Sequence, residues 1–184
     1  IYPDYKANRS DPPEDLVPQF PLVREAVRAL NIPAIERESF EADDVIAAYA
    51  HAAVADGLDV LIVSSDKDLM QLIGDHVSLY DPMKSRTLGA EAVLEKFGVT
   101  PDKVIEVQAL IGDSVDNVPG VPGIGPKTAA QLITEYGSLE AVLAAAETMK
   151  PGKRRDMLME HAHQARISYQ LVQLRHDIEL PMPI

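Results

Sequence analysis

The 184-residue sequence contains no cysteine and no tryptophan, and it has only three phenylalanines. Without cysteine the chain can form no disulfide, no Cys-ligated zinc site and no thiol nucleophile. No apolar run approaches the roughly 18 residues needed to cross a bilayer, and no secretory signal peptide is visible. Since 46% of the residues are nevertheless apolar, a core can form from aliphatic side chains. We expect a soluble, intracellular chain with one domain, or one domain and a small appendage.

Basic residues are also scarce. The sequence has 17 Lys and Arg against 29 Asp and Glu, which gives a formal charge of −12. Because phosphate binding normally requires a basic surface, the overall charge taken alone argues against a nucleic-acid partner. Two interpretations remain open: the acids form an ordinary solvated surface, or some of them cluster as metal ligands and are neutralised in use.

The apolar pattern predicts an α/β part followed by a purely helical part. Strands are expected at residues 32–36, 59–64 and 77–80, and helices or helical turns at 21–30, 39–57, 69–73, 89–97 and 100–111. Later residues predict only helices, at 127–136, 138–147 and 153–174. We therefore predict an α/β domain over 1–112 and a helical domain over 113–184. Three strands are few for a covered sheet, and the chain begins without Met, so we expect further strands upstream.

Seven acidic residues gather at three connections between the predicted elements. They are Glu41, Asp43 and Asp44 at a helix start, Asp66 and Asp68 after the buried strand, and Asp113 and Asp116. Each alone is typical of an ordinary capping or surface acid. Asp113 and Asp116 would share one face if their segment were helical. All three groups, however, are expected at the same edge of an α/β sheet, where such sheets bind ligands.

Converging carboxylates need compensation, because two of them about 4 Å apart repel by roughly 4 kcal/mol at an effective dielectric constant near 20. The cluster would therefore bind protons or divalent cations. Ligation by oxygen alone favours Mg²⁺ or Mn²⁺. Two such ions about 4 Å apart can activate a water molecule and stabilise the leaving oxygen of a phosphodiester.

A run of Gly and Pro over residues 118–126 predicts a hairpin between two helices. Gly123 and Gly125 permit close approach of the backbone. Amides at the start of the helix after Pro126 can bind a phosphate, and Lys127 adds a positive charge. The alternative interpretation is a tight helix–helix turn without a ligand.

Three motifs, in order, carry a resemblance to a known family. They are Glu41-Ala-Asp-Asp-Val-Ile46, Ser64-Ser-Asp-Lys-Asp-Leu69 and Gly112-Asp-Ser-Val-Asp-Asn-Val-Pro-Gly-Val-Pro-Gly-Ile-Gly-Pro-Lys-Thr-Ala129. Over nearly its entire length the chain resembles the 5′-nuclease domains of bacterial DNA polymerase I, in the flap endonuclease family. The resemblance implies an α/β fold with a PIN-like or resolvase-like, mostly parallel sheet covered by helices. An all-helical helix–hairpin–helix (H3TH) subdomain would follow.

The resemblance also implies a function, a two-metal, structure-specific 5′→3′ exonuclease and 5′-flap endonuclease acting in replication and repair. It assigns ligation of two Mg²⁺ or Mn²⁺ ions, direct or through water, to all seven acids, and catalytic roles to Asp44, Asp66 and Asp116. Lys6 and Arg9, which could otherwise be solvated charges, would contact the scissile phosphate from the base of a helical arch. Duplex DNA would bind the hairpin, which often holds K⁺ through its carbonyls, at Gly120, Gly123, Gly125, Lys127 and Thr128.

The partners that the resemblance implies are DNA with a 5′ flap, a nick or an RNA primer, and no membrane. The expected chain is a cytoplasmic, nucleoid-associated monomer, linked covalently to a C-terminal polymerase region. Family members carry two further acidic ligands before the arch, and this sequence starts after them. The alternative function is therefore a non-catalytic DNA-binding fragment or a nuclease-like module.

Overall fold

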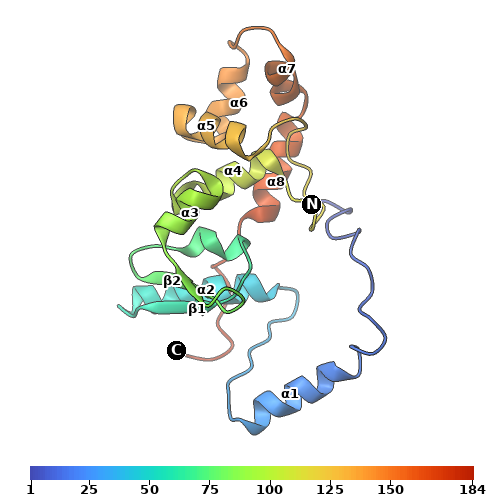
Figure 1. Ribbon diagram of the computed structural model, residues 1–184, viewed down its shortest axis with the longest axis vertical. Coiled ribbons are helices and arrows are strands. Elements are labelled where there is room, and N and C mark those ends of the chain that lie inside the picture. Colours follow the sequence, from blue (N-terminus) through green and yellow to red (C-terminus); the bar gives the residue numbers. More distant parts are fainter.

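The computed structural model describes residues 1–184 and contains one small sheet (Figure 1). The sheet has the order β1 (Val60–Val63), β2 (Val77–Asp81), β3 (Arg86–Leu88). β1 and β2 are parallel, and β3 runs antiparallel to β2. The two strands predicted in this region are confirmed. β3 was not predicted, since it is a three-residue edge strand whose pattern is mostly exposed.

Helices pack on this sheet and continue away from it. α2 (Ala42–Ala55) contacts β1, and it can approach closely because its buried positions are mostly alanine. α3 (Ala90–Phe97) follows β3 and ends at Gly98, and α4 (Val104–Ile111) extends the short 3₁₀ turn Pro101–Lys103. A second 3₁₀ turn, Asp68–Leu72, follows β1. These elements agree with the predicted helices.

The helical part is built around α4. α5 (Pro126–Tyr136) and α6 (Leu139–Ala146) pack on it, as does α8 (Ala162–Val172), while α7 (Lys153–Glu160) contacts α6 and α8. Figure 1 shows α4 and α8 between the sheet on one side and α5, α6 and α7 on the other. The single helix predicted over 153–174 is wrong. The chain breaks its helix at His161, with φ −103° and ψ 16°, so that α7 can pack on α6 while α8 packs on α4.

One hydrophobic core joins the two parts. Its 26 buried residues run from the sheet through α4 to α8. Leu79 of β2, Leu110 of α4 and Leu158 of α7 are all fully buried in it. Each buried side chain of this size stabilises the fold by about 1.5–3 kcal/mol. The helical part is therefore packed on the α/β part through a shared core.

The first forty residues contribute no buried side chain to this core. This segment contains α1 (Gln19–Ala29), which has no buried residue and stands away from the body in Figure 1. The strand predicted at 32–36 is wrong, because Pro33 has no N–H, Ile32 is exposed and the segment pairs with no strand. No helix in the structure combines the length and apolarity of a membrane span.

Both ends of the chain return to the body. The N-terminal segment lies on the turn after α4, where Lys6 N–H donates to the carbonyl of Asp116 at 2.9 Å and Asn117 Nδ2 donates to the carbonyl of Asp4 at 2.6 Å. The C-terminal segment lies over α2. There the Tyr49 hydroxyl donates to the Met182 carbonyl at 2.8 Å. These contacts bring residues from both ends close to the predicted site.

Candidate functional site

An open pocket of about 550 Å³ lies where the chain leaves the carboxyl end of β1. Its acidic lining residues come from two of the three predicted groups: Asp66, Asp68, Asp113 and Asp116. Arg9, Lys67 and Lys96 supply the basic groups. The structure therefore brings together residues that are up to 107 positions apart, as the Arg9–Asp116 contact shows. We call this cavity the acidic pocket.

Local hydrogen bonds place Asp66 and Asp68 directly after β1. Ser64 N–H still donates to the Tyr80 carbonyl of β2 at 3.0 Å, so the strand pairing holds the start of the turn. Asp66 N–H donates to Ser64 Oγ at 3.0 Å, and Asp68 N–H donates to Asp66 Oδ1 at 2.9 Å. Such short-range bonds favour a turn over continued strand. Both carboxylates thus stand at the sheet edge.

Gln108 is a site residue that the sequence analysis missed. It is buried in α4, and its Nε2 donates to Asp68 Oδ1 at 2.5 Å. Burial raises the pKa of Asp68 above its usual range, and the charge of Asp66 adds to this rise, while the Gln108 hydrogen bond partly opposes it. A glutamine within the otherwise apolar face of α4 was the available signal.

Asp113 and Asp116 lie in a tight turn and not in a helix. Asp113 and Val118 exchange backbone hydrogen bonds of 2.9 and 2.7 Å across it. The chain enters and leaves through Gly112 and Gly120, which touch backbone to backbone. A Cβ on Gly112 would lie 2.4 Å from the Val118 carbonyl oxygen, so no larger residue fits. This close approach fixes both carboxylates at the pocket.

Basic side chains of the protein itself neutralise part of the acidic pocket. The ammonium of Lys67 pairs with Asp113, whose side chain is 6% exposed. Lys6 pairs with Glu41, and its Nζ lies 3.6 Å from Asp116 Oδ2. Arg9 Nη2 lies 2.5 Å from Asp116 Oδ1. Burial would raise the pKa of Asp113, but hydrogen bonds from Lys67 and the Val115 N–H outweigh it and lower that pKa.

Asp43 has no cation partner. Burial at the start of α2 raises its pKa to about 6, and the negative charges of Asp66, Asp68 and Glu41 contribute to this rise. Because the charges of Asp66 and Asp68 act on Asp43, the group at the start of α2 lies near the pair that follows β1. This uncompensated part of the site is where an added cation would be stabilised most.

Asp44, unlike Asp43, is held by two hydrogen bonds from backbone N–H groups. Its Oδ2 accepts a hydrogen bond from Glu41 N–H at 3.2 Å, which completes a capping box at the start of α2. Its Oδ1 accepts a hydrogen bond from the Arg175 N–H at 2.8 Å. Asp44 therefore joins α2 to the C-terminal segment, and its assignment as a catalytic metal ligand rests on the resemblance.

The carboxylates of the site are suitable ligands for a metal ion, but their present positions are not those of a metal site. No three of the Asp, Glu and His side chains are placed so that they could hold an ion as they stand. The donors are carboxylates, which suit hard divalent cations. Asp43, Asp66 and Asp68 form no ion pair, whereas basic side chains hold Glu41, Asp113 and Asp116. Ion binding would therefore require side chains to move.

The Gly- and Pro-rich hairpin connects α4 to α5, and its tip is exposed. Gly123 and Gly125 lie at the surface, and Pro126 occupies the first turn of α5, where its missing N–H needs no partner. Lys127 is exposed and Thr128 half-buried. Gly120 is buried, and its N–H donates to Ser168 Oγ at 2.9 Å. Its amide is therefore already used and does not face a ligand.

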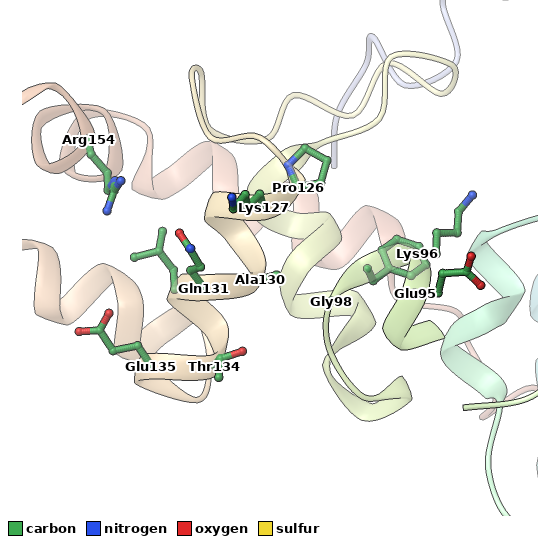
Figure 2. Close-up of a pocket in the computed structure, with 12 residues that line it drawn as sticks. Glu95, Lys96, Gly98, Pro126, Lys127, Ala130, Gln131, Thr134, Glu135 and Arg154 are labelled. Atoms are coloured by element: carbon green, nitrogen blue, oxygen red, sulfur yellow. The ribbon is translucent and has the colours of Figure 1, made fainter. Parts of the chain in front are cut away.

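A second open groove, of about 810 Å³, adjoins this hairpin. α3, α5 and α7 contribute its lining, including Lys96, Lys127 and Arg154 (Figure 2). We call it the α3–α5 groove. Lys96 lines both this groove and the acidic pocket, so the two cavities meet at that side chain.

Comparisons with known proteins agree with this architecture. Residues 1–98 match the family model described as 5′-3′ exonuclease, N-terminal resolvase-like domain, and residues 99–184 match 5′-3′ exonuclease, C-terminal SAM fold. The fold is thus a resolvase-like α/β domain followed by a helical SAM fold. The chain belongs to the 5′-3′ exonuclease family. The predicted fold class is confirmed, whereas the domain boundary after residue 112 stays a prediction.

Similar proteins include bacterial polymerases, an exonuclease and a solved phage protein. The chain is 57% identical to DNA polymerase I of Rhizobium leguminosarum over its entire length, which is 18% of that protein. It is 40% identical to the 5′-3′ exonuclease of Aquifex aeolicus (strain VF5), covering 99% of this chain and 62% of the relative. The structure of the T5 D15 protein with metal ions matches 92% of the chain and 67% of its own at 26% identity, with a TM-score of 0.81. The chain therefore spans less than two thirds of the length of the Rhizobium leguminosarum and Aquifex aeolicus relatives.

Proposed function

We propose that this chain forms part of a structure-specific 5′-nuclease that hydrolyses phosphodiester bonds at 5′ flaps, nicks and RNA primers on DNA. The observation that carries the proposal is the convergence of Asp66, Asp68, Asp113 and Asp116 beside Arg9 in one pocket. The similarity to DNA polymerase I supports a longer protein that also contains a polymerase region. Because the chain covers under a fifth of that relative, this link is part of the proposal.

Two divalent cations, Mg²⁺ or Mn²⁺, are the proposed cofactors. The T5 D15 flap endonuclease has been solved with DNA and metal ions, and the T5 5′-exonuclease with divalent zinc, which supports divalent metal use in this fold. Asp43, Asp66 and Asp68 would hold one ion, and Asp113 and Asp116 the other, with Glu41 and Asp44 acting directly or through water. When bound, such ions supply activation of water and stabilisation of the leaving oxygen. K⁺ at the hairpin carbonyls is the third proposed ion.

Lys6 and Arg9 are proposed to hold the phosphate that is cleaved. In the structure they lie at the acidic pocket and neutralise Glu41 and Asp116. A cation bound by these acids would replace that neutralisation, and the ammonium and guanidinium groups could then donate to phosphate oxygens. Arg presents a planar set of donors that suits phosphate well. Lys67 would remain the counterion that orients Asp113.

The exposed tip of the hairpin is proposed to bind duplex DNA through its backbone. Gly123, Gly125, Lys127 and Thr128 are placed at or near the surface at the start of α5. Contacts of this kind position the duplex without reading its sequence. The α/β part over 1–112 would then cleave, while the helical part over 113–184 holds the substrate.

One observation favours a second function, that of a DNA-binding module without catalysis. Basic side chains already pair with three of the seven acids, and no group of three is arranged for an ion. Such a module would bind the duplex through the same hairpin. It would not cleave under any metal condition.

A cleavage assay separates these functions. A 5′-labelled flap duplex, a nicked duplex and a blunt duplex are incubated with the protein in Mg²⁺, Mn²⁺ or EDTA. The nuclease proposal predicts release of the flap with either metal and none with EDTA. Tight duplex binding without cleavage in any condition would establish the binding module. Neither binding nor cleavage would contradict both.

A further inference from the structure

The side-chain amide of Gln71 joins its own turn to residues 101 and 103 positions downstream. Its Nε2 donates to the Asp68 carbonyl and to the Val172 carbonyl, each at 2.9 Å. Its Oε1 accepts a hydrogen bond from the Leu174 N–H at 3.1 Å. Val172 ends α8, where carbonyls lack a partner within the helix. Gln71 therefore fastens the end of α8 to the 3₁₀ turn that begins with Asp68.

The same short segment also holds the start of α2. The N–H of Arg175, the amide that follows Leu174, donates to Asp44 Oδ1 at 2.8 Å. Residues 172–175 thus reach two acidic groups at once, the group after β1 through Gln71 and the group at the start of α2 through Asp44. We call Gln71 together with residues 172–175 the α8 bridge.

The chain beyond the α8 bridge is anchored on α2. Ile178 is buried in a small apolar cluster with Val45 and Ala48 of that helix. Further along, the Tyr49 hydroxyl donates to the Met182 carbonyl at 2.8 Å. Figure 1 shows the C-terminal segment running from α8 past α2. The α8 bridge is therefore held between α8 on one side and α2 on the other.

The two acidic groups that the α8 bridge connects repel each other. The negative charges of Asp66 and Asp68 act on Asp43, and like charges favour separation when no cation lies between them. The α8 bridge opposes this separation with an amide side chain and backbone groups, which carry no net charge. It can therefore hold the groups together without neutralising them, and their charges stay available for a cation.

We propose that the α8 bridge sets the distance between the acids at the start of α2 and those after β1, with Gln71 as its central positioning residue. It thereby sets the affinity of these acids for divalent cations. Replacing a residue that orients metal ligands through hydrogen bonds typically costs about 10- to 100-fold in metal affinity or activity. This inference rests on the proposed nuclease function and adds Gln71 and the Arg175 N–H to the groups that shape the site.

Binding of Mn²⁺ without DNA, measured by isothermal titration calorimetry, tests the α8 bridge directly. Gln71→Met nearly keeps the side-chain volume but removes both donors and the acceptor, so it should weaken Mn²⁺ binding by about tenfold. Gln173→Ala is the matched control, since this exposed glutamine lies in the same segment and takes no part in these hydrogen bonds. Val142→Ala, which truncates a fully buried side chain of α6, is the stability control. It should lower the melting temperature and leave Mn²⁺ binding unchanged.

A second pair of variants tests the contact with Asp44. Arg175→Pro removes the N–H that bonds to Asp44, whereas Arg175→Ala removes the same side chain and keeps that N–H. Mn²⁺ binding should be about three- to tenfold weaker for the proline variant than for the alanine variant. Since both contacts belong to one bridge, Gln71→Met combined with Arg175→Pro should lose little more than the worse single variant. In EDTA, the Arg175 amide should exchange its hydrogen faster in Gln71→Met than in the wild type.

The outcomes separate this inference from the proposed function. Wild-type Mn²⁺ affinity in Gln71→Met, or an equal loss of affinity in Val142→Ala, would overturn the α8 bridge, while flap cleavage by the wild type left the proposed function standing. Fully additive losses in the double variant would also overturn it, because they would identify two independent contacts. A wild type that neither binds Mn²⁺ nor cleaves flap DNA would refute the nuclease proposal and the α8 bridge with it.

Discussion

Ser168 Oγ accepts a hydrogen bond from the buried backbone N–H of Gly120 at 2.9 Å, which ties α8 to the hairpin. The same hydroxyl donates to the Gln164 carbonyl at 2.9 Å, so its rotamer is fixed. Gly120 in turn touches Gly112, at the start of the turn that carries Asp113 and Asp116. A helix near the end of the chain therefore positions two acids of the candidate site.

Ser168→Ala should lower stability and loosen this turn. The Gly120 N–H would be left buried without an acceptor, which costs about 1–3 kcal/mol. Thermal unfolding should detect the loss as a lower melting temperature, and the affinity for Mg²⁺ should fall with it. Ser114→Ala is the control, since this exposed serine lies in the same turn and its side chain forms no hydrogen bond. Equal melting temperatures for the two variants would contradict the positioning role.

Gln108→Leu should separate stability from site chemistry. Gln108 Oε1 is buried without a partner, so an apolar side chain of similar volume removes an unsatisfied atom and should leave stability nearly unchanged. Asp68 would lose its hydrogen-bond donor. Its pKa, already raised by burial, should then rise further, since hydrogen bonding to the ionised form favours ionisation. An NMR titration of the Asp68 carboxyl would measure this, and an unchanged or lower pKa would exclude the contact.

Asp43 should make the metal-free protein less stable as pH rises. Its folded-state pKa is about 6, above the ordinary value of 3.8. The folded state therefore binds the proton more tightly, and the free energy of unfolding should fall between about pH 4 and pH 6. Because Asp43 is only half-buried, solvent screening limits the effect to about 1 kcal/mol.

Asp43→Asn provides the corresponding test. This variant should be more stable than the wild type at pH 7 in EDTA, and the two should converge near pH 4. Saturating Mg²⁺ should remove the advantage of the variant, because bound cations compensate the charge of Asp43. Denaturant unfolding at several pH values measures all three points. A wild type whose Asp43-dependent stability increases from pH 4 to pH 6 would show that the sign is wrong.

Much of the fold could be predicted because its main elements carry strong local signals. β1 is an aliphatic run, and α5 begins at the proline of Gly125-Pro126 and is capped by Gly137. The failures have tertiary causes. His161 looks compatible with a continuous helix, yet packing on different neighbours bends the chain there. The strand expected at 32–36 has no neighbour to pair with.

The sequence predicted which acidic residues form the candidate site better than it predicted the partners that hold them. Acidic motifs identified Asp66 and Asp113, and the sheet edge indicated that they would meet. Sequence did not reveal that Lys67 would pair with Asp113 or that Asp44 would bond to the backbone of Arg175, 131 positions away. Each pair joins segments that are 46 or 131 positions apart in the sequence, and only the tertiary fold brings them together. The hydrogen bond from Gly120 N–H to Ser168 Oγ was not predicted for the same reason, because Ser168 lies 48 positions downstream.

The most direct test of the account is single-turnover cleavage of a 5′-flap duplex in Mg²⁺ by the wild type, Asp66→Asn and Asp116→Asn. Asp102→Asn, an exposed acid outside the pocket, is the control. We predict that each pocket variant loses at least about a hundredfold in rate while duplex affinity in EDTA and the control rate stay within about twofold. Cleavage by Asp66→Asn and Asp116→Asn at the wild-type rate, or wild-type cleavage in EDTA, would contradict it.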